Sequence, residues 1–77
     1  MNTMTNIVIR NIYEYAKIRG MKIGYLERNA GFRQGYLTRV RAGDRRLTID
    51  TVYVLADLLD VTVDELCTPM IEGEDEP

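Results

Sequence analysis

The side chains of this 77-residue chain that could do chemistry are arginines and a single glutamine, Gln34. Glutamine can form two hydrogen bonds with an adenine edge and arginine two with a guanine edge, so these residue types suit the reading of DNA bases. Catalysis has little support, because the chain has no histidine and only one cysteine, Cys67. The sequence shows no zinc-ligand spacing, no calcium loop and no glycine-rich phosphate loop. We therefore expect neither an enzyme nor a metal or cofactor site.

Gln34 lies within residues 20–43, a stretch whose pattern predicts two helices joined by a tight turn. Leu26 and Ala30 are one helical turn apart, so they share one face of the first helix. Gly31 follows, and glycine ends helices readily because it adopts the left-handed conformation without steric penalty. The two helices are expected over Lys22–Ala30 and Arg33–Arg41.

The second of these helices has an apolar and a polar side. Its apolar face consists of Tyr36, Leu37 and Val40, and Phe32 is expected to fill the corner between the helices. Its polar side consists of Arg33, Gln34, Thr38, Arg39 and Arg41. Two helices that cross at a glycine turn, with long polar side chains on the second, form the helix-turn-helix arrangement for the DNA major groove.

Three further helices are predicted around this pair. The first covers residues 6–19 and has an inward stripe formed by Val8, Ile12, Tyr15 and Ala16. The fourth begins at the cap Thr48 and buries Val52, Leu55, Ala56 and Leu59. The fifth begins with a capping box, Thr62-x-x-Glu65, and buries Leu66 and Cys67. The sequence thus predicts an all-α domain of five helices.

This domain is expected to cover residues 1–71. Residues 72–77 carry charge without apolar content, so we expect them to form a disordered acidic tail. Three isoleucines lie off the inward stripe of the first helix and are expected to be surface hydrophobes or part of a subunit contact: Ile7, Ile9 and Ile18.

Charge is strongly separated along the chain, although the net charge is only −2. Residues 1–46 contain all ten Lys and Arg and three acidic residues, a net charge of +7. Residues 47–77 contain nine acidic residues and no basic one, a net charge of −9. The basic half coincides with the predicted helix-turn-helix, which orients that side toward a polyanion. Neither a signal peptide nor a run of about eighteen apolar residues is visible. The single cysteine, Cys67, cannot form an internal disulfide, so a reducing, cytoplasmic location is expected.

The central stretch resembles the helix-turn-helix of the phage repressor and Cro-like family of bacterial transcriptional regulators. The matching residues are Gly20, Leu26, Ala30, Gly31, Phe32, Tyr36, Leu37, Thr38, Arg39, Val40 and Gly43, together with Leu55–Leu66. The resemblance spans Ile12 to Leu66, most of the chain. It implies a compact repressor-like fold in which the second and third helices form the DNA-binding motif.

The resemblance implies that residues around the start of the second motif helix read base edges: Arg33, Gln34, Gly35, Thr38 and Arg39. The candidates for phosphate contacts are Lys22, Tyr36, Arg41, Arg45 and Arg46. Some of these residues have alternative roles. Gly35 could ease the tight start of the helix, Thr38 could bond its own helix backbone, and Tyr36 could pack against the first motif helix.

Several positions depart from the family pattern. Lys22 and Ile23 replace a polar pair, often Ser-Gln, whose Gln grips a phosphate, so Lys22 or backbone N–H groups must supply that contact. Ala16 and Arg41 replace an Arg–Glu pair seen in many relatives, which leaves Arg41 free for a phosphate. Ala42 replaces an Asn that often precedes the final glycine, so one phosphate contact is lost.

Glu27 is a further departure, because it replaces the small residue usual after the leucine of the first motif helix. A close helix crossing at this position would bury an unpaired charge, which costs several kcal/mol. We therefore expect Glu27 to lean outward or to meet a cation such as Arg28 or Arg33.

The sequence favours a sequence-specific regulator that binds double-stranded DNA, namely a small repressor of the phage or mobile-element kind. It would bind a palindromic operator as a homodimer. The dimer contact is expected at the fifth helix with residues 67–71, and Ile7 and Ile9 are the alternative. A second hypothesis is a helix-turn-helix used as a protein-interaction module, such as an antitoxin or adaptor, whose acidic half would occupy a basic partner. No membrane partner and no small-molecule ligand are indicated.

Overall fold

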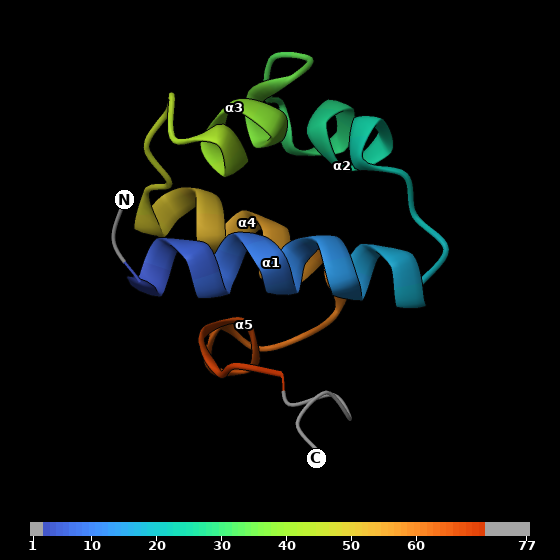
Figure 1. Cartoon of the computed structure of the whole chain (residues 1–77). Helices are drawn as coiled ribbons and strands as arrows, with labels where there is room; N and C mark the ends of the chain where they lie inside the picture. The colour runs from blue at the N-terminus through green and yellow to red at the C-terminus, as the bar shows by residue number, and fades with distance from the viewer. Residues whose placement is uncertain (1–2, 71–77) are drawn as a thin grey trace.

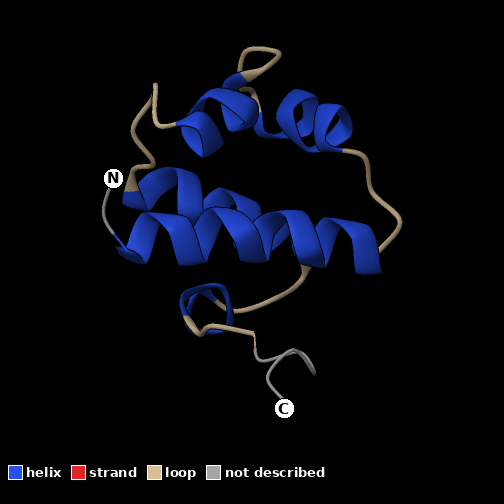
Figure 2. Cartoon of the chain, viewed as in Figure 1, coloured by secondary structure: helices blue, strands red, loops and turns tan. Residues whose placement is uncertain are grey.

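The computed structural model of the chain describes residues 3–70. It contains helices α1 (Thr3–Ile18), α2 (Ile23–Ala30), α3 (Tyr36–Ala42), α4 (Ile49–Leu59) and α5 (Val63–Cys67) (Figure 1). The described residues form helices and connecting loops without a strand (Figure 2), which confirms the predicted all-α fold. The expected domain end at residue 71 and the acidic tail 72–77 lie outside the described residues.

Helix α1 lies at the centre of the fold. It packs against α4, with α3 on one side and α5 on the other, and α2 packs against both α3 and α4 (Figure 1). Each helix contributes at least one side chain that is completely buried: Ile12, Leu26, Leu37, Leu55, Leu59 and Leu66. Burial of each such side chain stabilises the fold by about 1.5–3 kcal/mol. The core therefore joins the α2–α3 pair to α1 and α4.

The helix ends follow local signals that the sequence predicts. The Oγ1 of Thr48 accepts the backbone N–H of Thr51 at 3.2 Å and caps α4. At the start of α5, Glu65 Oε1 accepts the N–H of Thr62 at 2.8 Å and Thr62 Oγ1 accepts the N–H of Glu65 at 2.9 Å. This reciprocal pair is the predicted capping box.

The burial of residues on α1 differs in part from the prediction. Ile9 was expected at the surface or in a subunit contact, but only 4% of it is exposed. It belongs to the core because α1 is contacted by α3, α4 and α5, so its buried face is wider than a single stripe. Ile18 is 65% exposed and confirms the expectation of a surface hydrophobe. Asn11, which the sequence did not single out, is buried on the same helix.

Among residues 3–70, none of the helices combines the length and the apolar character that crossing a membrane requires.

Candidate nucleic-acid interface

Residues 31–35 join α2 to α3, and the end of α2 has the predicted glycine geometry. Gly31 has a φ of 80°, in the left-handed region that glycine adopts without penalty. The N–H of Phe32 donates to the Glu27 carbonyl at 2.8 Å, which closes the last turn of α2. The Phe32 ring then lies 4.9 Å from the Tyr36 ring at an angle of 54°, so it fills the corner between the helices.

Helix α3 begins later than predicted. It starts at Tyr36, with Gly35 as its N-cap at φ 88° and ψ −2°, whereas the prediction began at Arg33. The N–H of Tyr36 donates to the Arg33 carbonyl at 3.1 Å, so Gln34 and Gly35 form the corner of a tight turn. The left-handed φ at this corner favours glycine, which confirms the alternative role of Gly35. Arg33 and Gln34 therefore lie on the turn that precedes α3.

Glu27 contradicts the expectation that it would lean outward or meet a cation. Only 3% of the residue is exposed. Its Oε1 accepts the N–H of Gly35 at 3.0 Å, and its Oε2 accepts the N–H of Leu37 at 2.9 Å. The buried charge is thus met by backbone donors at the start of α3, where the helix dipole also favours an anion. Glu27 caps α3 from the neighbouring helix, a role that Gly35 cannot fill because it has no side chain.

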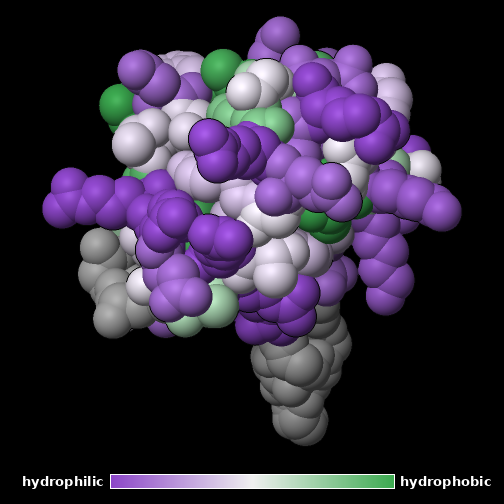
Figure 3. Space-filling view, turned by 90° about the horizontal axis from the view of Figure 1, so that it is seen from above, coloured by the Kyte–Doolittle hydropathy of each residue, from purple (hydrophilic) through white to green (hydrophobic). Residues whose placement is uncertain are grey.

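The predicted base readers lie in two groups around the start of α3. Arg33 and Gln34 are exposed on the turn, and Thr38 and Arg39 are exposed on the first turns of the helix, while Gly35 is half-buried between them. Figure 3 looks down on the molecule from the side of α2 and α3 and shows hydrophilic side chains over most of this face. The structure therefore presents the predicted Arg, Gln and Thr groups to solvent.

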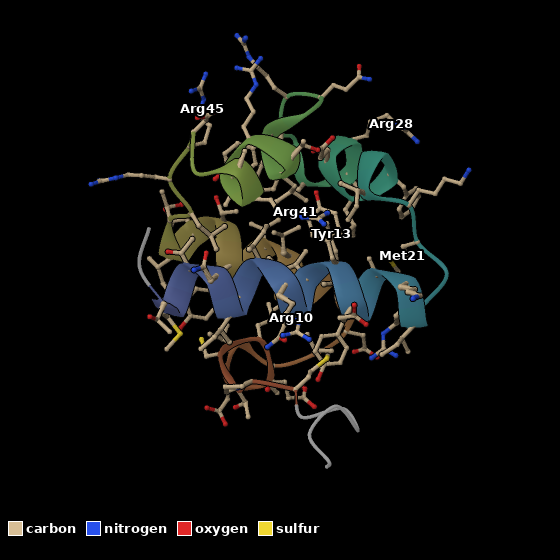
Figure 4. The ribbon with its side chains drawn as sticks, in the orientation of Figure 1. Arg10, Tyr13, Met21, Arg28, Arg41 and Arg45 are labelled. Carbon is tan, nitrogen blue, oxygen red and sulfur yellow. The ribbon has the colours of Figure 1, made fainter. Side chains whose placement is uncertain are left out.

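Three of the phosphate candidates are exposed near this face. Lys22 is the N-cap residue of α2, and its side chain makes no capping hydrogen bond. Arg45 and Arg46 lie in the loop between α3 and α4, and Arg45 points away from the core (Figure 4). Residues 42–48 of this loop, with Thr5, line a surface hollow of about 690 Å³. Arg45 and Arg46 in this loop are therefore accessible from solvent.

Tyr36 is half-buried and Arg41 is exposed, and both of these phosphate candidates contact other groups of the protein. The Tyr36 hydroxyl donates to the Arg46 carbonyl at 2.7 Å, which ties the basic loop to the start of α3. The Arg41 guanidinium lies 4.5 Å from the centre of the Tyr13 ring on α1, a cation–π contact (Figure 4). The structure therefore places Arg41 between α3 and α1 and does not bring it together with Arg45 and Arg46.

The electrostatics of the motif differ from those of the rest of the chain. Residues 20–46 contain seven basic and two acidic residues, a net charge of +5, and one of these acids is the buried Glu27. The described residues beyond position 46 contain five acidic residues and no basic one. A cation outside the motif, Arg19, donates to the Leu59 and Asp60 carbonyls and caps α4. Seven of the ten basic residues thus lie in the motif, and two others, Arg10 and Lys17, are exposed on α1.

The described residues contain no group of three His, Cys, Asp or Glu side chains placed to hold a metal ion.

Two short helices joined by a glycine turn, with exposed Arg, Gln and Thr side chains on a basic surface, define a helix-turn-helix DNA-binding domain.

Comparison with known proteins agrees with this class. Residues 12–66 match the family described as helix-turn-helix. The chain is 35% identical over 69 residues to an uncharacterized HTH-type transcriptional regulator, y4dJ, of Sinorhizobium fredii (strain NBRC 101917 / NGR234), and the match covers 90% of each chain. No solved structure matches the chain. The chain belongs to the helix-turn-helix family of repressor and Cro-like transcriptional regulators, a family of DNA-binding proteins and not of enzymes.

Proposed function

We propose that this protein is a repressor of the phage or mobile-element kind that binds a palindromic DNA operator as a homodimer. The observation that carries the proposal is the exposure of Arg33, Gln34, Thr38 and Arg39 around the start of α3, on a segment with a net charge of +5. The similar protein of Sinorhizobium fredii, named as a transcriptional regulator, supports a regulatory role.

In the proposed complex, base reading and phosphate binding are divided between two sets of residues. Gln34 pairs with an adenine edge and Arg33 or Arg39 with a guanine edge, while Thr38 contacts a thymine methyl group. Gly35 allows the backbone to approach the bases closely. Lys22, Arg45 and Arg46 contact phosphates, which supplies affinity without sequence preference.

The phosphate role proposed for Tyr36 and Arg41 requires them to exchange or share present partners. The Tyr36 hydroxyl has one hydrogen, which it donates to the Arg46 carbonyl. While it keeps this bond it cannot donate to a phosphate. Tyr36 therefore supports DNA binding by anchoring the loop that contains Arg46. Arg41 would have to leave the Tyr13 ring to reach a phosphate. Tyr36 and Arg41 are therefore expected to contribute less to phosphate binding than Arg45 and Arg46.

A dimer is proposed because one recognition helix contacts too few base pairs to find a single site in a genome. Two copies would read half-sites roughly 34 Å apart. The apolar end of α5, where Cys67 and Met70 are half-buried, is the proposed contact surface.

Selection of bound sequences from a random DNA pool tests this function. We expect one palindromic sequence to be enriched, and its binding constant to fall steeply as salt rises because cations on the DNA are released. A pool without an enriched sequence, or with a single half-site bound by one protein molecule, would contradict the proposal.

A second candidate function, a protein-interaction module, is favoured by the outer face of α4. Ile49 and Tyr53 are each 61% exposed one helical turn apart, and the acidic Asp50 and Asp57 lie on the same exposed side of the chain. A basic, apolar protein surface would complement this face. If DNA selection fails, replacement of Tyr53 by aspartate should abolish binding to such a partner and leave the fold intact.

A further inference from the structure

We propose that Glu27 is the positioning residue for base reading: its buried carboxylate holds the turn that carries Gln34 in the conformation that faces the major groove. This inference rests on the proposed function and deepens it by naming a residue on which the sequence preference depends. Glu27 lies on α2, and only 3% of it is exposed. It therefore acts through the turn and not by contact with DNA.

The carboxylate holds the turn at two points. Its Oε1 bonds the N–H of Gly35 and its Oε2 bonds the N–H of Leu37, at 3.0 and 2.9 Å. The N–H between them, that of Tyr36, donates to the Arg33 carbonyl at 3.1 Å. Three consecutive backbone donors are thus engaged. Because both carboxylate oxygens are used, the backbone from Gly35 to Leu37 cannot rotate without breaking a charge-assisted hydrogen bond.

No neighbouring side chain presses against the Cα of Gly35. A Cβ atom built on Gly35 would meet no atom within 4 Å. Glycine also populates left-handed and right-handed conformations about equally. The two bonds to Glu27 therefore select the observed φ of 88°, and this φ sets the direction of the exposed Gln34 side chain next to it.

The same contacts separate base reading from phosphate binding. The first backbone donors of a helix are a common phosphate site, but in α3 Glu27 occupies two of them with its own negative charge. A DNA phosphate is therefore excluded from this helix end, and phosphate contacts are left to Lys22, Arg45 and Arg46. Glutamine at position 27 would still fill this place, so Glu27→Gln should change sequence preference and leave the number of phosphate contacts unchanged.

The test compares Glu27→Gln with Glu14→Gln, which removes the same charge from a half-buried position on α1. The probes are the DNA sequence that the wild-type protein enriches from a random pool and a scrambled version of it. We expect Glu27→Gln to lower the ratio of the two binding constants by about tenfold. The slope of log K against log salt concentration should be the same for Glu27→Gln as for Glu14→Gln. The control Glu14→Gln should keep the wild-type ratio of the two binding constants.

A double-mutant cycle identifies the route of the effect. In the Gln34→Ala background, Glu27→Gln should cause no further loss of the ratio, because Glu27 acts through Gln34. Amide hydrogen exchange of the free protein gives a second measure. The Gly35 and Leu37 amides should exchange faster in Glu27→Gln, while the Val40 amide inside α3 stays protected. If the Glu27→Gln variant does not fold, the same measurements are made on Glu27→Ala, which also removes the buried charge.

Three results would overturn the inference: an unchanged ratio, an equal loss of affinity on both DNA probes, or additive losses in the double-mutant cycle. Each would mean that Glu27 only stabilises the domain. Failure of the proposed function gives a different result, because the wild-type protein itself would then enrich no sequence.

Discussion

The side-chain amide of Asn11 on α1 donates a hydrogen bond of 2.8 Å to the backbone carbonyl of Leu66, 55 positions later in the chain. The same amide group donates its other hydrogen to the Thr68 carbonyl, also at 2.8 Å. Only 1% of Asn11 is exposed. The last carbonyl groups of a helix have no partner within it, and here a side chain of α1 satisfies one of them in α5 and the carbonyl of the following C-cap residue.

We therefore predict that Asn11→Ala lowers the free energy of unfolding by about 3 kcal/mol, because it leaves buried carbonyls without donors and opens a cavity. Urea unfolding followed by circular dichroism measures this change. Asn6→Ala, at an exposed position of the same helix, is the control and should change stability by less than about 0.5 kcal/mol. Equal effects of the two substitutions would show that the Asn11 bonds contribute nothing to stability.

Two glycines should respond to alanine in opposite directions. Gly35 has a φ of 88° and open space around it, so Gly35→Ala should destabilise by about 1–2 kcal/mol through backbone strain alone. Gly24 lies inside α2, where a Cβ would meet only the Arg28 side chain at 3.7 Å, an ordinary contact. Gly24→Ala should therefore stabilise by about 0.5–1 kcal/mol.

Thermal and urea unfolding of both variants checks this prediction. Gly35→Asn is the matched control, since asparagine tolerates the left-handed region better than alanine and should lose less stability. A stabilising Gly35→Ala substitution would mean that the left-handed conformation of this turn is not the one adopted in solution.

Base readers and phosphate contacts should differ in their response to alanine. Gln34→Ala or Arg39→Ala should weaken binding to the selected DNA sequence by about 1–3 kcal/mol and binding to scrambled DNA far less. Arg45→Ala or Arg46→Ala should weaken both about equally and reduce the salt slope by about one unit, because each removes one phosphate contact. Titrations on the two DNA sequences at several salt concentrations measure both quantities. A uniform loss for Gln34→Ala and Arg39→Ala would assign these residues to phosphate or structural roles.

The end of α5 should carry the dimer contact on DNA. Met70 is half-buried there, and Met70→Asp should lower the number of protein molecules bound per palindromic site from two to one, because a charge cannot be buried unpaired in an apolar contact. Analytical ultracentrifugation of the protein–DNA complex measures this ratio. Tyr53→Asp on the exposed face of α4 is the comparison. If Tyr53→Asp and not Met70→Asp breaks the dimer, the subunits meet through α4.

Much of the fold follows from interactions between neighbours in the chain. The caps at Thr48 and Thr62, the left-handed Gly31 and the apolar spacing of α4 involve residues no more than a few positions apart, so the sequence alone predicts them. The exposure of Arg33, Gln34, Thr38 and Arg39 was predicted on the same basis, since polar residues beside an apolar stripe face solvent. Their part in reading DNA remains a prediction.

Tertiary structure decided the residues whose partners are distant in the chain. Glu27 was expected to lean outward or to meet a cation, but the fold brings the backbone donors of Gly35 and Leu37 to its buried carboxylate. Arg41 was expected to be free for a phosphate, but the packing of α3 on α1 brings its guanidinium against the Tyr13 ring. Ile9 was expected at the surface or in a subunit contact, but α3, α4 and α5 pack around α1 and bury it. A polar side chain can be buried only where hydrogen-bond partners surround it, and an apolar side chain is buried where other apolar groups pack against it. For these residues the partners are distant in the chain, so only the packing of the helices determines which groups they are.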